Sequence, residues 1–271
     1  MNNLTILLTG GTGSFGNKFI KMTLKKFNPK KIIIFSRDEM KQWYMAEKIK
    51  DKRVRFFLGD VRDKDRLNRA ADGVDIIIHA AALKIVPTAE YNPFETVKTN
   101  IIGAMNIIDV AIEKKVKKVI ALSTDKACDP INFYGATKLA SDKLFISSNA
   151  SYASGHKTRF SIVRYGNVMG SRGSIIPFFL SLKNSNEIPI TDERMTRFMI
   201  SVDEGVELVW HAFEDMINGE VYVKKIPSMK VVDIAKVIVP KAKYKIIGIR
   251  PGEKLHEQMI SSEDSYSTFE Y

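Results

Sequence analysis

The 271-residue sequence is poor in cysteine: Cys128 is the only one, so no intrachain disulfide can form. No apolar stretch approaches the length that spans a bilayer. Residues 1–8 run straight into a glycine turn, without the apolar core of a signal peptide. These absences predict a cytoplasmic protein in a reducing compartment, with no membrane association, and they make Cys128 a packed side chain rather than a nucleophile.

Acidic residues are also few relative to basic ones, with 31 Asp and Glu against 42 Lys and Arg, which gives a formal net charge of +11. A basic surplus can indicate a polyanionic partner such as a nucleic acid. Here, however, lysines outnumber arginines 30 to 12, and arginine is the usual reader of base edges. We therefore interpret the surplus as solvated surface and expect no nucleic acid partner, although a basic nucleic-acid-binding module stays as an alternative.

The first half of the chain alternates short apolar runs with longer segments of helical spacing. The expected strands are residues 4–8, 32–35, 54–58, 74–78, 119–122 and 160–164, and the expected helices include residues 15–27, 41–50 and 97–114. This alternation predicts an α/β fold with a doubly wound parallel sheet, the Rossmann arrangement. Residues 1–165 should form that domain. Residues 166–271 should form mainly a smaller substrate domain, with a soft boundary because later segments could return to the sheet.

Three glycines at a spacing of three follow the first expected strand and open the first expected helix. The first glycine permits a tight turn, and the second lets backbone N–H groups approach a pyrophosphate. The third lets the helix pack against the strand, so the pattern predicts a dinucleotide-binding turn. The residues expected in this part of the cofactor site are Gly10, Thr12, Gly13, Ser14, Phe15 and Gly16.

The second expected strand ends in Ser36 and Arg37 rather than in an acid. A hydroxyl and a guanidinium suit a 2′-phosphate, and Lys41 could assist, so NADP is favoured over NAD. Asp38 follows directly and could instead hold a ribose hydroxyl, which keeps NAD open. The ends of the third and fourth strands complete the expected cofactor site with Asp60, Val61, Ala80 and Ala81.

The candidate catalytic residues follow the fifth strand, which ends in Thr124, Asp125 and Lys126. Tyr134 and Lys138 come next, and because they are four residues apart they share one face of a helix. Beside a nicotinamide, Lys138 is expected to lower the pKa of the Tyr134 phenol and to hold the ribose. Tyr134 could then take a proton from an alcohol that Thr124 also contacts, so both Tyr134 and Lys138 belong to the cofactor site as well.

Together with Ser123-Thr124 and the run Tyr134-Gly-Ala-Thr-Lys138, these motifs resemble the extended short-chain dehydrogenase/reductase superfamily, whose members mostly act on nucleotide sugars. Longer strings at residues 79–84, 123–127, 164–168, 195–198 and 250–254 are similar to the inverting UDP-N-acetylglucosamine 4,6-dehydratases that begin pseudaminic acid synthesis. The resemblance extends from residue 5 to about residue 262. It implies an enzyme with NADP as cofactor, UDP-N-acetylglucosamine as substrate, no metal, and a homo-oligomeric state, either a dimer or a hexamer.

The chemistry of the fifth strand end agrees with the resemblance. A 4-epimerase needs only the Thr, Tyr and Lys groups, whereas a dehydratase must also remove the C5 proton and expel the 6-hydroxyl. Asp125 and Lys126 fit that need. Lys126 would take the C5 proton as a neutral amine, and for this its pKa must be lowered by burial or by nearby Lys138. Protonated Asp125 would act as the acid for the leaving hydroxyl. Reprotonation from the opposite face would invert C5, with a proton donor that the sequence does not identify. A UDP-sugar 4-epimerase and a catalytically silent NADP-binding regulator are the alternatives.

The resemblance also implies a substrate site built mainly from the second half of the chain. Arg172 would pair with a diphosphate, Asn167 would contact the diphosphate or sugar, and Lys84 would line the sugar pocket. The uridine side would use Thr191, Met195 and Arg197, and the Arg-Pro-Gly-Glu-Lys element would use Arg250 and Glu253. Family members usually continue several tens of residues past this element, so we expect this chain to lack a tail that packs on the substrate domain.

Overall fold

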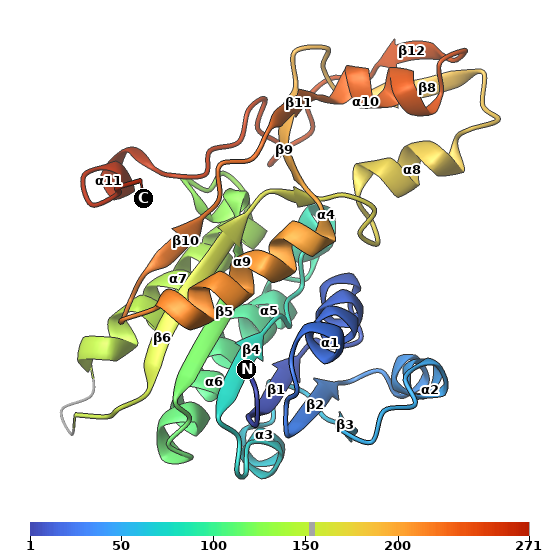
Figure 1. Ribbon diagram of the computed structural model, residues 1–271. Helices are drawn as coiled ribbons and strands as arrows, with labels where there is room; N and C mark the ends of the chain where they lie inside the picture. The colour runs from blue at the N-terminus through green and yellow to red at the C-terminus, as the bar shows by residue number, and fades with distance from the viewer. Residues whose placement is uncertain (152–154, 271) are drawn as a thin grey trace.

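A seven-stranded sheet forms the larger of two lobes in the computed structural model, which describes residues 1–151 and 155–270 (Figure 1). Its strand order is β10-β6-β5-β4-β1-β2-β3, and every pairing is parallel. The order reverses between β1 and β4, and this confirms the predicted doubly wound α/β fold. The strands are β1 (Thr5–Thr9), β2 (Lys31–Ser36), β3 (Val54–Leu58), β4 (Ile76–His79), β5 (Lys118–Thr124), β6 (Arg159–Tyr165) and β10 (Val221–Val223).

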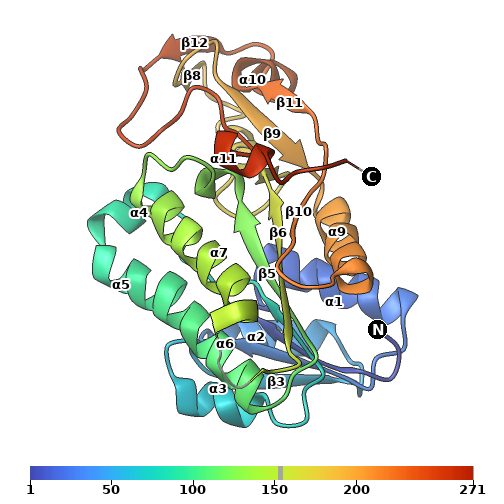
Figure 2. The ribbon, with the colours of Figure 1, turned by 90° about the vertical axis from the view of Figure 1, so that its left-hand side faces the viewer.

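Helices cover both faces of the large sheet (Figure 2). One face carries α1 (Ser14–Lys26), α2 (Glu39–Lys48) and α9 (Val202–Asp215), and the other carries α3 (Lys64–Ala70), α6 (Gly103–Glu113) and α7 (Phe133–Ser151). The helix predicted over residues 97–114 begins earlier, because α5 (Pro93–Val97) continues through a π-helical turn, η1 (Lys98–Ile102), into α6. A short helix, α4 (Val86–Tyr91), precedes it. None of the helices within the described ranges is both long and apolar enough to cross a membrane.

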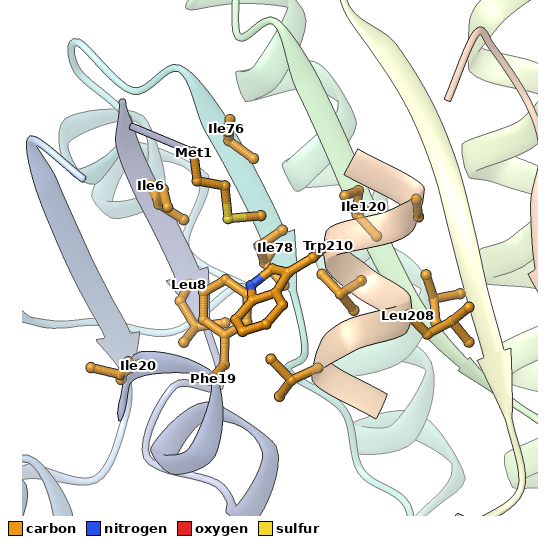
Figure 3. Close-up of a cluster of buried hydrophobic side chains, with 14 of the residues drawn as sticks. Met1, Ile6, Leu8, Phe19, Ile20, Ile76, Ile78, Ile120, Leu208 and Trp210 are labelled. Atoms are coloured by element: carbon orange, nitrogen blue, oxygen red, sulfur yellow. The ribbon is translucent and has the colours of Figure 1, made fainter. Parts of the chain in front are cut away.

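The core between the sheet and α1/α9 explains why the strands are continuously apolar. Ile6, Leu7 and Leu8 of β1 are all fully buried, because a sheet covered on both faces has no solvent side. Figure 3 shows Phe19 of α1 and Trp210 of α9 packed over Leu8 and its neighbours on the sheet. The Trp210 indole N–H donates a hydrogen bond to the Thr23 hydroxyl at 3.2 Å, so its one polar group is satisfied in the core.

The smaller lobe has a hydrophobic core of its own, which includes Phe179, Ile188, Met199 and Ile234. Its elements are β7 (Asn167–Val168), α8 (Ile175–Ser181), β8 (Glu187–Ile190), β9 (Thr196–Ile200), β11 (Ser228–Lys230), α10 (Val231–Ile238) and β12 (Lys243–Ile246). The sequence did not indicate α8 or the strands of this lobe, which are two to five residues long and too short to show a period. The predicted boundary at residue 166 stays a prediction, and α9 and β10 lie on the large sheet.

The C-terminal segment, residues 247–270, returns from the smaller lobe to the large sheet and includes the short helix α11 (Ser262–Ser265) (Figure 2). Arg164 of β6 holds it there: the buried guanidinium donates to the Met259 carbonyl at 3.2 Å and pairs with Asp264 at 3.0 Å. The other side of the same guanidinium lies 3.5 Å from Asp142 of α7. The segment is therefore fixed against the larger lobe by a buried charge network.

Truncating Phe19 tests the packing of α1 and α9 on the sheet. Phe19→Ala should lower the free energy of unfolding by about 3–5 kcal/mol, because it opens a cavity in a fully buried core. Urea denaturation followed by circular dichroism measures the change. Lys25→Ala, on the exposed side of α1, is the matched control and should change stability by less than about 0.5 kcal/mol. A similar small change for Phe19→Ala would contradict the described core.

Candidate active site

The glycine turn at the carboxyl end of β1 is sterically closed on the protein side and open on the other. Gly10 has a φ of +65°, and a Cβ there would stand 2.7 Å from the Ala80 carbonyl oxygen. A Cβ on Gly16 would stand 2.1 Å from the Gly11 carbonyl oxygen. A Cβ on Gly13 would meet only the Gly10 carbonyl, at 3.1 Å, so backbone at Gly13 is accessible to a ligand.

The other predicted members of this turn lie around the same point. Ser14 begins α1, so the helix N-terminus points its free N–H groups toward the open side of the turn. Thr12 is buried, and Phe15 packs against the core under α9. Ala80 and Ala81 follow β4 immediately beside Gly10, where their small side chains leave room. The turn thus has the shape and the donors that a pyrophosphate requires.

At the end of β2 the polar groups are already partly engaged. The Ser36 hydroxyl accepts a hydrogen bond from Gln42 Nε2 at 3.1 Å. Asp38 caps α2 by accepting the Lys41 N–H at 2.9 Å, and its carboxylate also pairs with the Lys41 ammonium. The Arg37 side chain is half-exposed and makes a long contact of 3.5 Å with Asp60. Of the two cations at this strand end, Arg37 is therefore the less engaged, because Lys41 pairs with Asp38. The Asp38 carboxylate caps the N-terminus of α2.

The residues after β3 have structural partners as well. Asp60 accepts the Arg62 backbone N–H at 3.0 Å and pairs with the Arg62 guanidinium at 2.7 Å. Val61 is buried against Gly103, where a Cβ would approach it to 2.8 Å. Both residues lie at the same sheet edge as the glycine turn.

The end of β5 turns directly into η2 (Asp125–Ala127), a 3-10 turn that gathers the predicted catalytic groups. The Thr124 hydroxyl donates to Asp125 Oδ1 at 3.0 Å and accepts the Lys126 N–H at 3.3 Å. Lys126 Nζ donates to the same Asp125 Oδ1 at 3.0 Å. Asp125 is fully buried, and its other oxygen, Oδ2, has no hydrogen-bond partner within the described residues.

The start of α7 packs directly on this turn. A Cβ on Gly135 would stand 2.2 Å from the Lys126 carbonyl oxygen, so only glycine permits the approach. Asn132 caps the helix by accepting the Gly135 N–H at 2.7 Å. Tyr134 and Lys138, both buried, are therefore brought onto the turn from one face of α7, and Lys138 Nζ donates to the Leu122 carbonyl at 2.9 Å.

The electrostatics of α7 differ from the sequence expectation. Burial raises the pKa of the Tyr134 phenol, a hydrogen bond with Thr124 opposes this, and the charges of Asp125 and Asp142 raise it further. Burial also lowers the pKa of Lys138, while Asp142 raises it. The pKa of Tyr134 is therefore raised overall, and its lowering by Lys138 stays a prediction.

Sequence reasoning missed one residue of this cluster, Glu257 of the C-terminal segment. Its Oε1 lies 3.4 Å from Lys126 Nζ, and its side chain is only 3% exposed. Its second oxygen, Oε2, has no hydrogen-bond partner within the described ranges. Glu257 follows the Arg-Pro-Gly-Glu-Lys element by a few residues, but no spacing signal connects it with Lys126, because the contact depends on the tertiary path of the segment.

The predicted substrate residues fall into two groups. The first lies at the catalytic edge. The Arg172 guanidinium donates to the Thr12 carbonyl at 2.7 Å, and the Arg172 backbone N–H donates to the Ser14 hydroxyl at 3.2 Å. Arg172 therefore contacts the glycine turn, which the sequence did not predict. Lys84 is exposed as a residue, yet protein atoms crowd its ammonium. This burial lowers its pKa, and the nearby charges of Arg172 and Lys126 lower it further.

The second group lies in the smaller lobe and its connections. Asn167 is in β7, paired with Met199, and Thr191 directly follows β8. Met195 is buried in the core of that lobe. Arg197 donates to the Leu255 carbonyl at 3.3 Å, and Arg250 donates to Glu253 Oε1 at 3.0 Å.

In the described part of the chain, no group of three or more His, Cys, Asp or Glu side chains could hold a metal ion. Cys128 is buried, and burial raises the pKa of its thiol to about 11, which agrees with a packed side chain.

Comparison with known proteins gives matches over nearly the whole chain. The family model described as polysaccharide biosynthesis protein matches residues 6–271. A protein of Campylobacter jejuni subsp. jejuni named UDP-N-acetylglucosamine 4,6-dehydratase (inverting) is 58% identical over 272 residues, which cover 100% of this chain and 81% of the relative. A protein of Rickettsia akari named UDP-glucose 4-epimerase is 45% identical over 96% of this chain and 78% of its own.

Two solved structures are similar as well. The X-ray structure of Pen from Bacillus thuringiensis superposes with a TM-score of 0.95 at 38% identity, covering 100% of this chain and 87% of that one. DesIV of Streptomyces venezuelae, a dTDP-glucose 4,6-dehydratase solved with NAD and TYD bound, has a TM-score of 0.85 at 21% identity, covering 96% and 89%. At that identity the second likeness supports the fold alone.

One titratable group beside the site gives a pH prediction. His79 ends β4, is fully enclosed and shares a hydrogen bond of 2.8 Å with the Thr9 hydroxyl. Burial lowers its pKa to about 3, and the charge of Lys138 adds to this. His79 is therefore neutral in the folded protein, whereas in the unfolded chain its pKa is about 6.5.

Because the unfolded chain binds a proton at His79 that the folded chain does not, stability should fall as pH decreases from about 6.5 toward 3. The contribution approaches about 1.4 kcal/mol per pH unit well below 6.5. His79→Gln, which keeps a partner for Thr9, should flatten this dependence. Urea unfolding at pH 7 and at pH 5.5 measures it, and parallel curves for the two proteins would refute the assignment.

Proposed function

The chain belongs to the polysaccharide biosynthesis protein family and is a nucleotide-sugar dehydratase, and we propose that it converts UDP-N-acetylglucosamine to a UDP-4-keto-6-deoxy-N-acetylhexosamine with inversion at C5. The observation that carries this proposal is the packing of Thr124, Asp125 and Lys126 on Tyr134. The 58% identity to the Campylobacter jejuni protein supports it. The product would enter pseudaminic acid synthesis for surface or flagellar glycans, and a cytoplasmic location stays a prediction of the sequence.

A nicotinamide dinucleotide fits the glycine turn, because Gly10 and Gly16 permit the close backbone packing that forms the turn, Gly13 leaves its open side free, and α1 begins there. When bound, the cofactor accepts a hydride from the sugar and later returns it. The choice of NADP rests on Ser36 and Arg37 at the end of β2. The engagement of Asp38 as a helix cap supports it, since that carboxylate is directed to the N–H groups of α2 rather than to a ribose.

In this proposal, Tyr134 takes the proton of the 4-hydroxyl as a phenolate, which requires the cationic Lys138 to offset the effect of burial on the phenol pKa. Thr124, at the end of β5, supports the same oxygen. Lys138 lies one turn further along the same face of α7 and holds the nicotinamide ribose. The first step, oxidation at C4, makes the C5 proton acidic because the new ketone stabilises the resulting carbanion.

Elimination then falls to Asp125 and Lys126. Moving one proton across their 3.0 Å hydrogen bond turns Lys126 into a neutral amine and Asp125 into a carboxylic acid. The amine removes the C5 proton, and the acid protonates the departing 6-hydroxyl. The proton that Asp125 delivers to that hydroxyl is the one that Oδ1 receives from Lys126, while Oδ2 has no partner among the described residues. The sequence predicts that burial or Lys138 makes the neutral form of Lys126 accessible, and we propose this transfer as a further route to it, because Asp125 and Glu257 lie beside the ammonium.

A UDP-sugar 4-epimerase is the second candidate, and the name of the Rickettsia akari relative favours it. Epimerisation would use Thr124, Tyr134 and Lys138 but give Asp125 and Lys126 no task. The buried ion pair of these two residues therefore favours dehydration.

We also propose that the chain forms a homo-oligomer, either a dimer or a hexamer. Tyr91 at the end of α4 and Phe94 in α5 are 88% and 81% exposed, and Ile85 and Met105 are exposed nearby in the chain. Exposed apolar side chains gathered on adjacent elements support association with another protein surface.

The decisive experiment is incubation of the protein with UDP-N-acetylglucosamine and NADP in D₂O, followed by NMR. The expected product is a 4-keto-6-deoxy sugar with deuterium at C5 and inverted configuration there. Lys126→Ala should abolish elimination and leave cofactor binding intact, because Lys126 removes the C5 proton. A C4 epimer without loss of water would refute the dehydratase, and retained configuration would refute only the inversion.

Cofactor choice can be measured separately by titrating NADP and NAD into the protein and following the affinity of each. Arg37→Ala should weaken NADP binding by about 10-fold to 100-fold, the effect of one charge-assisted hydrogen bond to phosphate. NAD binding should change by less than about 3-fold, because NAD lacks the 2′-phosphate. Lys48→Ala, which removes the same charge from the exposed side of α2, is the control. Equal losses for both cofactors would argue against a 2′-phosphate contact.

A further inference from the structure

Glu257 and Asp125 flank the Lys126 ammonium from opposite parts of the chain. Lys126 Nζ lies 3.0 Å from Asp125 Oδ1 and 3.4 Å from Glu257 Oε1. The two carboxylates are 1% and 3% exposed, whereas the Lys126 side chain is 21% exposed. The lysine is thus the most exposed member of the set.

We propose that Glu257 is a positioning residue for the elimination step: it orients Lys126 and stabilises the ammonium that forms when Lys126 takes the C5 proton. The inference rests on the proposed dehydratase function and assigns a role within that site to the C-terminal segment. Glu257 acts through Lys126, as the carboxylate of a catalytic triad acts through its histidine.

The unsatisfied oxygens of the two carboxylates argue against a purely structural ion pair. Asp125 Oδ2 and Glu257 Oε2 are both buried and have no hydrogen-bond partner within residues 1–151 and 155–270. Leaving a buried carboxylate oxygen unpaired costs stability, so each such oxygen calls for an explanation. Replacing three buried charges with apolar side chains is often neutral or stabilising, so stability alone gives no reason to keep them beside the proposed catalytic groups.

Proton and charge accounting shows when Glu257 becomes important. Before elimination, Lys126 is an amine, Asp125 is protonated and Glu257 is ionised. The C5–H and C6–O bonds then break, the C5–C6 double bond forms, Lys126 gains the C5 proton and the Asp125 proton leaves in water. Afterwards the Lys126 ammonium lies between two carboxylates. The ion pair with Glu257 seen in the structure is lost when Lys126 gives its proton to Asp125 and is restored during the step, so Glu257 stabilises the ammonium that forms relative to the amine that precedes it.

The chain on both sides of Glu257 is bonded to the catalytic edge. Lys254 Nζ donates to the Cys128 carbonyl at 2.7 Å, just after η2. Asn132, the cap of α7, donates through Nδ2 to the Gly252 carbonyl at 2.9 Å. Arg164 binds the Met259 carbonyl on the other side. These contacts hold the backbone at Glu257 beside Lys126, which a positioning role requires.

Other charged groups face this set and bear on its pH dependence. Lys84, from the segment after β4, is close enough to Lys126 for the two charges to interact, and Arg172 acts on Lys84 as well. Tyr134 of α7 faces Asp125. Glu257 is the negative charge that stabilises the protonated forms of the groups around it. Removing that charge therefore makes loss of a proton from these groups easier.

Glu257→Gln tests the proposal because it keeps the shape and removes the charge. We expect the kcat of elimination, followed by NMR in D₂O, to fall by about 100-fold or more. Cofactor reduction in the first step, followed by absorbance, and the KM should change by less than about 3-fold, because neither uses Lys126. The pH optimum of kcat should move to lower pH, since the variant lacks a negative charge.

Two further variants complete the test. Glu257→Asp keeps the charge and should keep the wild-type pH optimum even where its kcat is lower, and it serves if the Gln variant does not fold. Glu263→Gln removes an exposed carboxylate of the same segment and should behave as wild type.

Three outcomes would overturn the inference: wild-type activity in Glu257→Gln, an equal loss of cofactor reduction and elimination, or a loss of kcat with an unmoved pH optimum. If only Glu257→Asp folds, a shifted pH optimum in that variant would overturn it as well. A wild-type protein that fails to dehydrate the substrate would instead refute the proposed function, so the two failures are distinguishable.

Discussion

The buried charge of Arg164 constrains three parts of the molecule at once. The arginine is fixed in β6, and its guanidinium pairs with Asp142 of α7 on one side and with Asp264 of the C-terminal segment on the other. A buried ionic group is stable only while its partners are in place, and loss of one partner costs about 3–5 kcal/mol. The position of α7 on the sheet and the return of the C-terminal segment are therefore linked through one side chain.

Asp142 connects Arg164 with the predicted catalytic residues. Asp142 follows Tyr134 and Lys138 at intervals of one helical turn, and it accepts a hydrogen bond of 2.6 Å from Ser123 beside Thr124. Burial raises its pKa, and the charge of Lys138 acts in the opposite direction. The same carboxylate thus connects the end of β5, the face of α7 that carries Tyr134, and the arginine that holds the last part of the chain.

The sequence predicts the cofactor turn and the Thr124–Lys138 cluster because both follow parallel strands, and the carboxyl ends of such strands meet at one edge. The sequence alone predicts the roles of Gly10 and Gly16, because a turn of this kind excludes a Cβ at both positions. Glu257 and Arg172 are not readable in this way. Each reaches its contact across the lobes, and neither a period nor a spacing encodes such a path. The contact of Lys126 with Glu257 was missed for the same reason: the second carboxylate comes from a distant segment.

The C-terminal segment is bonded to both lobes, and this has a mechanical consequence. Within a few residues of Glu257, the Leu255 carbonyl accepts hydrogen bonds from the β9 backbone and Arg197, and His256 binds the Thr196 hydroxyl at 2.8 Å. The Met259 carbonyl, by contrast, is anchored on the large sheet. A rotation of the smaller lobe must therefore strain these bonds or change the separation of Glu257 and Lys126. The distance between Lys126 and Glu257 therefore depends on the relative orientation of the two lobes.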